Sequence, residues 1–170
     1  MQIIMQLPFF HFNLKTNVVM MPDSWVIKLS VEACQLLATS YSYEELTLAP
    51  RTLKNTVRSN KSHTNHPITK WANTSLDNWL HVIDFALQSI EEYKYRFEKT
   101  ADPFHMTFIR WCQNNIPNLP EIGFTWPYKP IGYEHLDICD AYRCYFNDKK
   151  QHIAIWRKRD IPEWFIKCKT

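Results

Sequence analysis

The chain has only two glycines, Gly123 and Gly132, among its 170 residues. Phosphate-binding loops of the P-loop and Rossmann types need several closely spaced glycines, so this scarcity excludes both kinds of site. No apolar run reaches the length that a bilayer-spanning helix needs, and we expect no membrane partner. The opening stretch MQIIMQLPFF lacks a basic segment and a small-residue cleavage site, so we expect no signal peptide.

Closely spaced cysteine pairs are also missing. The five cysteines are scattered and none forms a C-x-x-C pair, which is typical of reduced thiols in a cytoplasmic protein. His63 and His66 lie three residues apart, but no second pair of zinc ligands follows them. We therefore expect no metal and no cofactor.

The apolar residues follow a helical pattern and predict a mainly α protein, with one compact helical domain over residues 1–170. About four helices are expected, at 23–41, 75–99, 103–115 and 136–155. Asp23 or Ser24 is the expected N-cap of the first helix. Residues 1–20 are expected to form an arm that is either irregular or a short edge strand. The proline-rich stretch 116–133 is expected to be an extended crossover loop.

Positive charge is concentrated in two segments of the chain. Residues 51–70 and 149–170 together carry a net charge of +10, and the remaining chain carries −7. A separation of this kind is typical of a face that binds a polyanion such as DNA. The alternative is two solvated basic surfaces without a partner.

The segment KSHTNHPITKW, residues 61–71, combines cations and histidines with the expected start of a helix. A helix N-terminus favours phosphate groups, and neighbouring lysines strengthen such a site. The alternative is an ordinary helix entry with Asn65 as the cap, Pro67 in the first turn and Trp71 in the core. The candidate nucleic-acid contacts in this segment are Lys61, His63, Asn65, His66 and Lys70.

Near the C-terminus, cations are interleaved with aromatic residues. Cations neutralise phosphates and aromatic rings stack on unpaired bases, so this pattern also favours nucleic-acid binding. The alternative is a last helix whose aromatic residues pack inside while its cations face water. Arg96 is a further candidate phosphate contact, or else half of a structural pair with Glu92. The candidates near the C-terminus are Arg143, Lys149, Lys150, Arg157, Lys158 and Arg159.

Lys28 and Glu32 lie one helical turn apart in the stretch DSWVIKLSVEACQLL. Glu32 is a candidate catalytic carboxylate that would stabilise a cationic sugar and move protons, with Lys28 as its electrostatic or nucleophilic partner. The alternative is an ordinary salt bridge on the helix surface.

Over nearly its whole length the chain resembles an uncharacterised family of small proteins from tailed phages. The pieces that carry this resemblance are DSWVIKLSVEACQLL, SHTNHPITKW, DNWLHVIDFAL, EEYKYRF, AYRCYF and IAIWRKRDIPEWF.

The chain also distantly resembles the pyrimidine-dimer DNA glycosylases of the phage endonuclease V type, which are small, helical, cofactor-free repair enzymes. The matching positions are the pair Asp23 and Glu32, nine residues apart, then His66-Pro67, and Arg96-Phe97 at the end of a long helix. Two positions depart from that pattern. Trp25 stands where the family has a histidine, and Gln2 stands where the family exposes a small residue with a free amine.

The resemblance implies a DNA-binding protein related to base-excision glycosylase and AP lyase enzymes that act on damaged DNA. Because residue 2 is Gln, the nucleophile would be the amine of Met1 or of Lys28, and lysine amines can form Schiff bases. The alternative is a non-enzymatic phage accessory protein that binds a nucleotide or a host protein.

Overall fold

A computed structural model describes residues 7–50 and 64–166 of the chain. Every regular element in these residues is helical and none is a strand, which confirms the mainly α prediction. The α-helices are α1 (Leu14–Val19), α2 (Asp23–Ala38), α3 (Tyr43–Leu48), α5 (Pro67–Ala72), α6 (Leu76–Phe97), α7 (Met106–Asn114) and α8 (Ile138–Lys149). A short 3₁₀ turn, Gln151–Ile153, follows α8.

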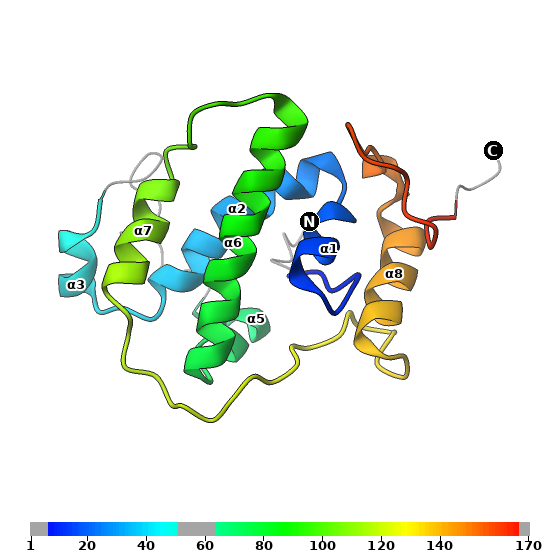
Figure 1. The fold of residues 1–170 in the computed structure, drawn as a ribbon. Helices are drawn as coiled ribbons and strands as arrows, with labels where there is room; N and C mark the ends of the chain where they lie inside the picture. Colours follow the sequence, from blue (N-terminus) through cyan, green and yellow to red (C-terminus); the bar gives the residue numbers. More distant parts are fainter. Residues whose placement is uncertain (1–6, 51–63, 167–170) are drawn as a thin grey trace.

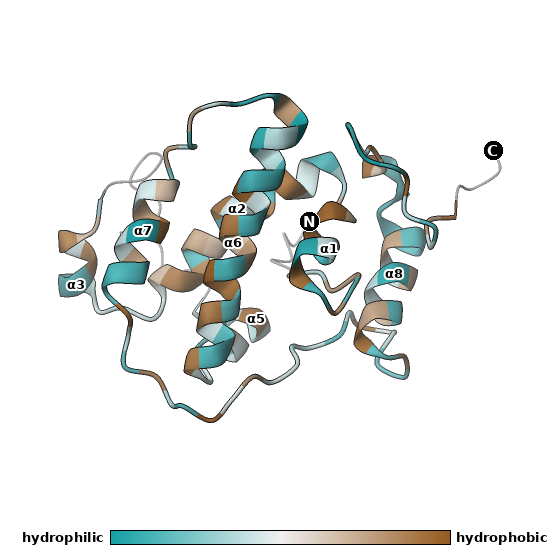
Figure 2. Cartoon of the chain, viewed as in Figure 1, coloured by the Kyte–Doolittle hydropathy of each residue, from teal (hydrophilic) through white to brown (hydrophobic). Residues whose placement is uncertain are grey.

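The long helices α2 and α6 pack against each other and form the centre of the molecule. Figure 1 shows α3 and α7 at one end of this pair and α8 at the other. Hydrophobic and hydrophilic residues alternate around α6 (Figure 2), so the helix buries one side and exposes another. The predicted stripe of α2 lies in the core, and its buried residues are Val26, Leu29, Ala33, Leu36 and Leu37.

The four predicted helices correspond to α2, α6, α7 and α8, and the helix start expected near Pro67 is α5. The six-residue helices α1 and α3 were not predicted. Helices α1, α3 and α5 are too short for a periodic apolar pattern to show. The arm at 7–13 is irregular rather than an edge strand, and its Leu7, Phe9 and Phe10 are buried. The last predicted helix is also shorter than expected, because α8 ends at Lys149 and only the 3₁₀ turn continues it.

Two predicted helix caps were wrong. Pro22 is the N-cap of α2 and makes no side-chain cap bond, because the Asp23 carboxylate is directed instead at Arg96. At α5 the N-cap is His66, whose Nδ1 accepts a hydrogen bond from the Ile68 N–H at 3.3 Å, whereas Asn65 lies exposed in the preceding turn.

The crossover between α7 and α8 runs along one edge of the molecule (Figure 1) and contains no helix before α8 begins at Ile138. The buried Asn78 of α6 holds it in place. Asn78 Oδ1 accepts the Thr125 N–H at 2.9 Å, and Asn78 Nδ2 donates to Thr125 Oγ1 at 2.8 Å. Trp71 of α5 donates its indole N–H to the Thr125 carbonyl at 2.8 Å. The extended loop is therefore fixed to two helices at one residue.

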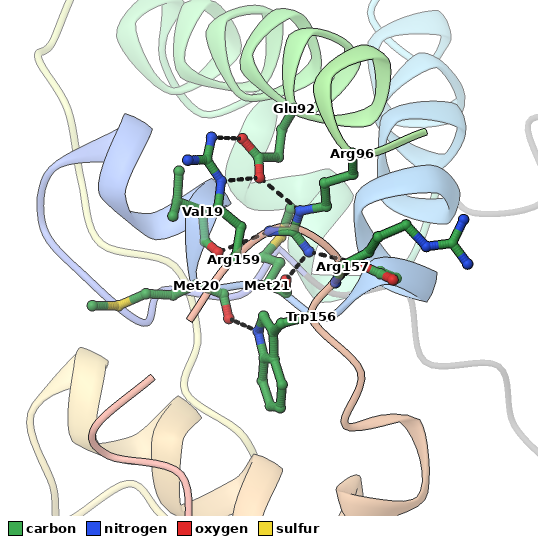
Figure 3. Close-up of polar contacts among 9 residues, drawn as sticks. Val19, Met20, Met21, Glu92, Arg96, Trp156, Arg157 and Arg159 are labelled. Atoms are coloured by element: carbon green, nitrogen blue, oxygen red, sulfur yellow. Dashed lines mark hydrogen bonds and ion pairs between the residues drawn. The ribbon is translucent and has the colours of Figure 1, made fainter. Parts of the chain in front are cut away.

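A buried guanidinium joins two distant parts of the chain (Figure 3). The side chain of Arg96 is fully buried and ion-paired with Asp23 at 3.0 Å and with Glu92 at 2.6 Å. Its remaining N–H groups donate to the carbonyls of Met21 and Val19, each at 2.8 Å. Arg96 thereby fixes the α1–α2 turn to the last turn of α6.

The segment 154–160, here called the strap, adds a second layer to this cluster. Arg159 donates two hydrogen bonds to Glu92, both at 2.8 Å, and the backbone N–H of Arg157 donates to Asp23 at 2.9 Å. Trp156 donates its indole N–H to the Met20 carbonyl at 2.8 Å (Figure 3). Burial alone would raise the pKa of Glu92, but its hydrogen bonds with the two arginines outweigh burial and lower it. The fold therefore keeps Glu92 ionised.

We predict that Arg96→Met destabilises the protein by about 3–5 kcal/mol, because it leaves the buried Asp23 and Glu92 carboxylates without their central cation. The measurement is urea unfolding at pH 7. The matched control is Arg110→Met, which breaks a 2.6 Å pair with Asp102 from an arginine that is 60% exposed. That change should cost less than about 1 kcal/mol, and equal losses in both variants would contradict the prediction.

Candidate functional site

Lys28 and Glu32 form an ion pair on α2. The Lys28 ammonium lies 3.1 Å from Glu32 Oε1. The Glu32 side chain is 11% exposed, whereas that of Lys28 is 51% exposed. The carboxylate is therefore nearly buried, and the lysine paired with it lies at the surface. The predicted pair is present, and its exposed end is accessible.

Asp23 and Arg96, which also matched the glycosylase pattern, do not lie beside this pair. Nine residues separate Asp23 from Glu32, and on a regular helix this spacing is about 13 Å along the axis and about half a turn in direction. Arg96 contacts Asp23 and is fully buried. It therefore lies near the side of α2 that carries Asp23, opposite the side that carries Glu32, and away from solvent. The structure thus joins Asp23 to Arg96 and separates both from Glu32.

The segment at 61–71 is described only in part. Lys61 and His63 lie outside the described residues. His66 is half-buried as the α5 cap, Asn65 is exposed in its turn, and Lys70 is exposed on α5. Trp71 is buried, as the core alternative expected.

Carboxylates from the same chain pair with three of the six candidate cations near the C-terminus. Arg159 is bound by Glu92, and Lys158 by Glu98. Arg143 donates to the Phe10 carbonyl at 3.0 Å and pairs with Asp140 at 3.2 Å. The separation of charge seen along the sequence is thus partly cancelled in three dimensions.

Three cations remain more accessible in this part of the molecule. Lys149 and Arg157 are exposed, and Lys150 is intermediate in exposure. The guanidinium of Arg157 lies 4.8 Å from the centre of the Phe97 ring, and the ammonium of Lys150 lies 5.8 Å from that of Tyr145. These contacts leave the cations at the surface.

The structure reveals a cluster of exposed aromatic side chains that the sequence analysis did not identify. We call Phe12, Phe124, Trp126 and Tyr128 the ring surface; they are 63%, 40%, 52% and 69% exposed. The Trp126 ring centre lies 5.5 Å from that of Phe12 and 5.1 Å from that of Phe124. Large exposed apolar patches mark interaction sites far more often than single exposed residues do.

A signal for the ring surface was present in the sequence. Phe124, Trp126 and Tyr128 occupy every second position of an extended loop, and alternate side chains of an extended chain point to one side. The prolines and glycines nearby were read only as signs of a loop. The contribution of Phe12, more than a hundred residues earlier, could come only from the fold.

His81 of α6 lies directly behind these rings. Its ring stacks on Phe9 at 5.2 Å with an interplanar angle of 11°, and Phe124 lies 5.2 Å away on a tilted plane. The buried Nε2 has no hydrogen-bond partner among the described residues. Burial lowers the pKa of His81 to about 4, so the ring is neutral at neutral pH.

Residues 7–50 and 64–166 contain no group of three or more His, Cys, Asp or Glu side chains that could hold a metal ion. No helix in the same residues is long and apolar enough to cross a membrane. Cys34, Cys112, Cys139 and Cys144 are all free thiols. Cys168 lies outside the described residues.

We predict that His81 makes the protein less stable in mild acid. Because the folded state lowers its pKa, the unfolded chain takes up a proton first, and stability falls from about pH 6.5 down to about pH 4. Between pH 7 and pH 5 this effect amounts to about 2 kcal/mol.

His81→Phe keeps a ring against Phe9 and should remove this part of the pH dependence. The measurement is the urea unfolding free energy at both pH values. The control is His152→Phe at an exposed histidine, which should retain the full dependence. Identical pH dependence in wild type and His81→Phe would contradict the prediction.

Comparisons of the chain with protein-family models, curated proteins and solved structures find no match. The resemblances to tailed-phage proteins and to pyrimidine-dimer glycosylases therefore stay predictions. The candidate features on which function can be argued are the Lys28–Glu32 pair and the ring surface.

Proposed function

We propose that the protein binds DNA and that unpaired bases stack on the ring surface. The observation that carries this proposal is the group of exposed rings formed by Phe12, Phe124 and Trp126, with the exposed Tyr128 two residues further along the crossover. Base–aromatic stacking contributes about 1–3 kcal/mol per base and tolerates any sequence, because every base has a flat face. A single strand, or a duplex with a displaced base, offers such faces.

The position of the first basic segment supports the same proposal. Segment 51–70 ends on α5, where Lys70 is exposed. The next residue, Trp71, bonds to Thr125 of the crossover, and its ring centre lies 6.0 Å from that of Phe124. Lys70 is thus one residue along α5 from a side chain that contacts the ring surface, which suits a strand whose phosphates and bases are bound together.

The second basic segment has a smaller part in this proposal. Arg159 and Lys158 hold the strap through Glu92 and Glu98, so replacing them would disturb the fold as well as the charge. Lys149, on α8, is exposed and has no ion-pair partner among the described residues. It is therefore the better position at which to test a phosphate contact in this segment.

We predict that Trp126→Ala weakens binding to a single-stranded oligonucleotide by about 1–3 kcal/mol without changing its salt dependence. Lys70→Ala should instead lower the slope of log affinity against log salt by about 1, because one phosphate contact is lost. Fluorescence anisotropy between about 50 and 200 mM salt measures both effects.

The control for the ring surface is Tyr43→Ala, which removes a 70% exposed aromatic residue from α3 at the other end of the molecule. Its affinity should equal that of wild type. Absence of binding at low salt would remove DNA from the list of partners. Equal losses in Trp126→Ala and Tyr43→Ala would remove the ring surface from the binding site.

We further propose the Lys28–Glu32 pair as the place of base-excision chemistry, on the strength of its 3.1 Å contact and its accessible lysine. Glu32 would take a proton from the Lys28 ammonium, and the freed amine would attack C1′ of the sugar. The bond to the damaged base would break, and the base would leave with the electron pair. The leaving base would take up the proton held by Glu32, and the regenerated carboxylate would stabilise the positive charge on the sugar. The carboxylate would then take a proton from the amine bound to C1′ and pass it to O4′ as the C1′–O4′ bond breaks, which leaves a protonated imine.

We predict that Glu32→Gln lowers base excision by about two to four orders of magnitude while DNA binding survives, because the change keeps the shape and removes the charge. Excision is measured on ultraviolet-irradiated duplex and trapping on abasic duplex, with borohydride to reduce the imine. Glu44→Gln, at an exposed acid of α3, is the control and should act as wild type.

Lys28→Ala separates the two candidate nucleophiles. Loss of trapping would assign the imine to Lys28, and retained trapping would assign it to the amine of Met1. A wild-type protein that never traps on damaged or abasic DNA would exclude the lyase mechanism. The non-enzymatic accessory protein would then be the remaining alternative.

A further inference from the structure

An open groove lies between the end of α1, α8 and residues 159–164. It has a volume of about 500 Å³, within the range of small-molecule sites. Its apolar lining includes Val19, Met20 and Trp164, and its charged residues come from α8 and from the strap and the residues after it. The charged lining residues are Arg143, Arg159, Asp160 and Glu163.

Both arginines that line this groove have one guanidinium nitrogen that makes no hydrogen bond to the rest of the described chain. Arg159 uses Nε and Nη2 on Glu92, and Arg143 uses Nε on the Phe10 carbonyl and Nη1 on Asp140. Arg159 Nη1 and Arg143 Nη2 therefore have no acceptor among the described residues. Because the other nitrogens already hold each side chain in place, a bound anion would lose little affinity to ordering them.

Two carboxylates limit which anions suit the groove. Asp160 and Glu163 are exposed and have no ion-pair partner in the described part of the chain. They repel a small, highly charged anion, but they accept hydrogen bonds from an amine. A fitting ligand therefore carries an anionic group at one end and an N–H donor at the other, joined by a flat or apolar body that packs on Trp164.

We propose that this groove binds a nucleoside monophosphate whose base carries an exocyclic amine. The phosphate contacts Arg143 and Arg159, the base amine donates to Asp160 or Glu163, and the ring of Trp164 forms the apolar wall. The site shares no residue with the ring surface and does not depend on DNA binding.

The test is isothermal titration calorimetry of the full chain with CMP, UMP and inorganic phosphate. CMP and UMP differ at the exocyclic group, which is an amine in CMP and a carbonyl in UMP. We expect saturable CMP binding, with UMP weaker by about tenfold for loss of a hydrogen bond to a charged acceptor. Inorganic phosphate should be weaker than both. Equal affinity for CMP and UMP, phosphate binding as tightly as CMP, or no saturable binding would each overturn the proposal.

Variants then locate the site. Arg143→Gln should weaken CMP binding about tenfold or more, whereas Lys15→Gln, at an exposed cation on α1, should leave it within about twofold. The double variant Asp160→Asn and Glu163→Gln keeps both arginines and should abolish the preference for CMP over UMP. Unchanged selectivity there would overturn the role of the carboxylates even if Arg143→Gln failed to fold. Trp126→Ala should bind CMP as wild type does, which separates this site from the DNA-binding proposal.

Discussion

The buried guanidinium of Arg96 is the interaction on which the arrangement of the helices depends. It binds the Glu92 carboxylate on α6 and the Asp23 carboxylate at the start of α2. It also donates hydrogen bonds to the Val19 and Met21 carbonyls, where α1 leads into α2. A buried charge is tolerated only when its partners satisfy it, so each of these segments has one permitted position relative to the others. The strap completes the same cluster from the other side through Glu92 and Asp23.

This arrangement explains why the cations near the C-terminus do not form a continuous basic face. Arg159 and Lys158 lie where α6 presents Glu92 and Glu98, and each cation meets a carboxylate. Sequence position alone separates the positive strap from acids some sixty residues away. The fold brings them together, so charge counted along a chain overestimates the field at the surface.

The long helices could be predicted from the sequence, because each has enough turns for its apolar residues to recur at helical spacing. The stripe from Val26 to Leu37 and the core residues of α6 follow from that spacing alone. The six-residue helices could not be predicted in this way, since their stability comes from packing and caps such as His66. The cap of α2 was predicted wrongly for another reason. A local rule predicts that the Asp23 carboxylate caps the helix, but this carboxylate instead accepts a hydrogen bond from Arg96, seventy-three residues away.

The candidate site shows the same division. The spacing of Lys28 and Glu32 predicts their contact, because one helical turn is a local distance. Nothing local relates Phe12 to Trp126 or Arg143 to Arg159, and both the ring surface and the groove depend on such distant neighbours.

The position of the strap also has a consequence for how the chain is made. A ribosome synthesises Glu92 and Arg96 about sixty residues before Arg157 and Arg159, an interval of roughly 3–12 s at ordinary elongation rates. During this interval Arg96 can already meet Asp23 and Glu92, but the outer side of Glu92 and the Met20 carbonyl have no strap to bond. The nascent helices would thus assemble around a half-satisfied cluster, which the strap completes once it has been synthesised.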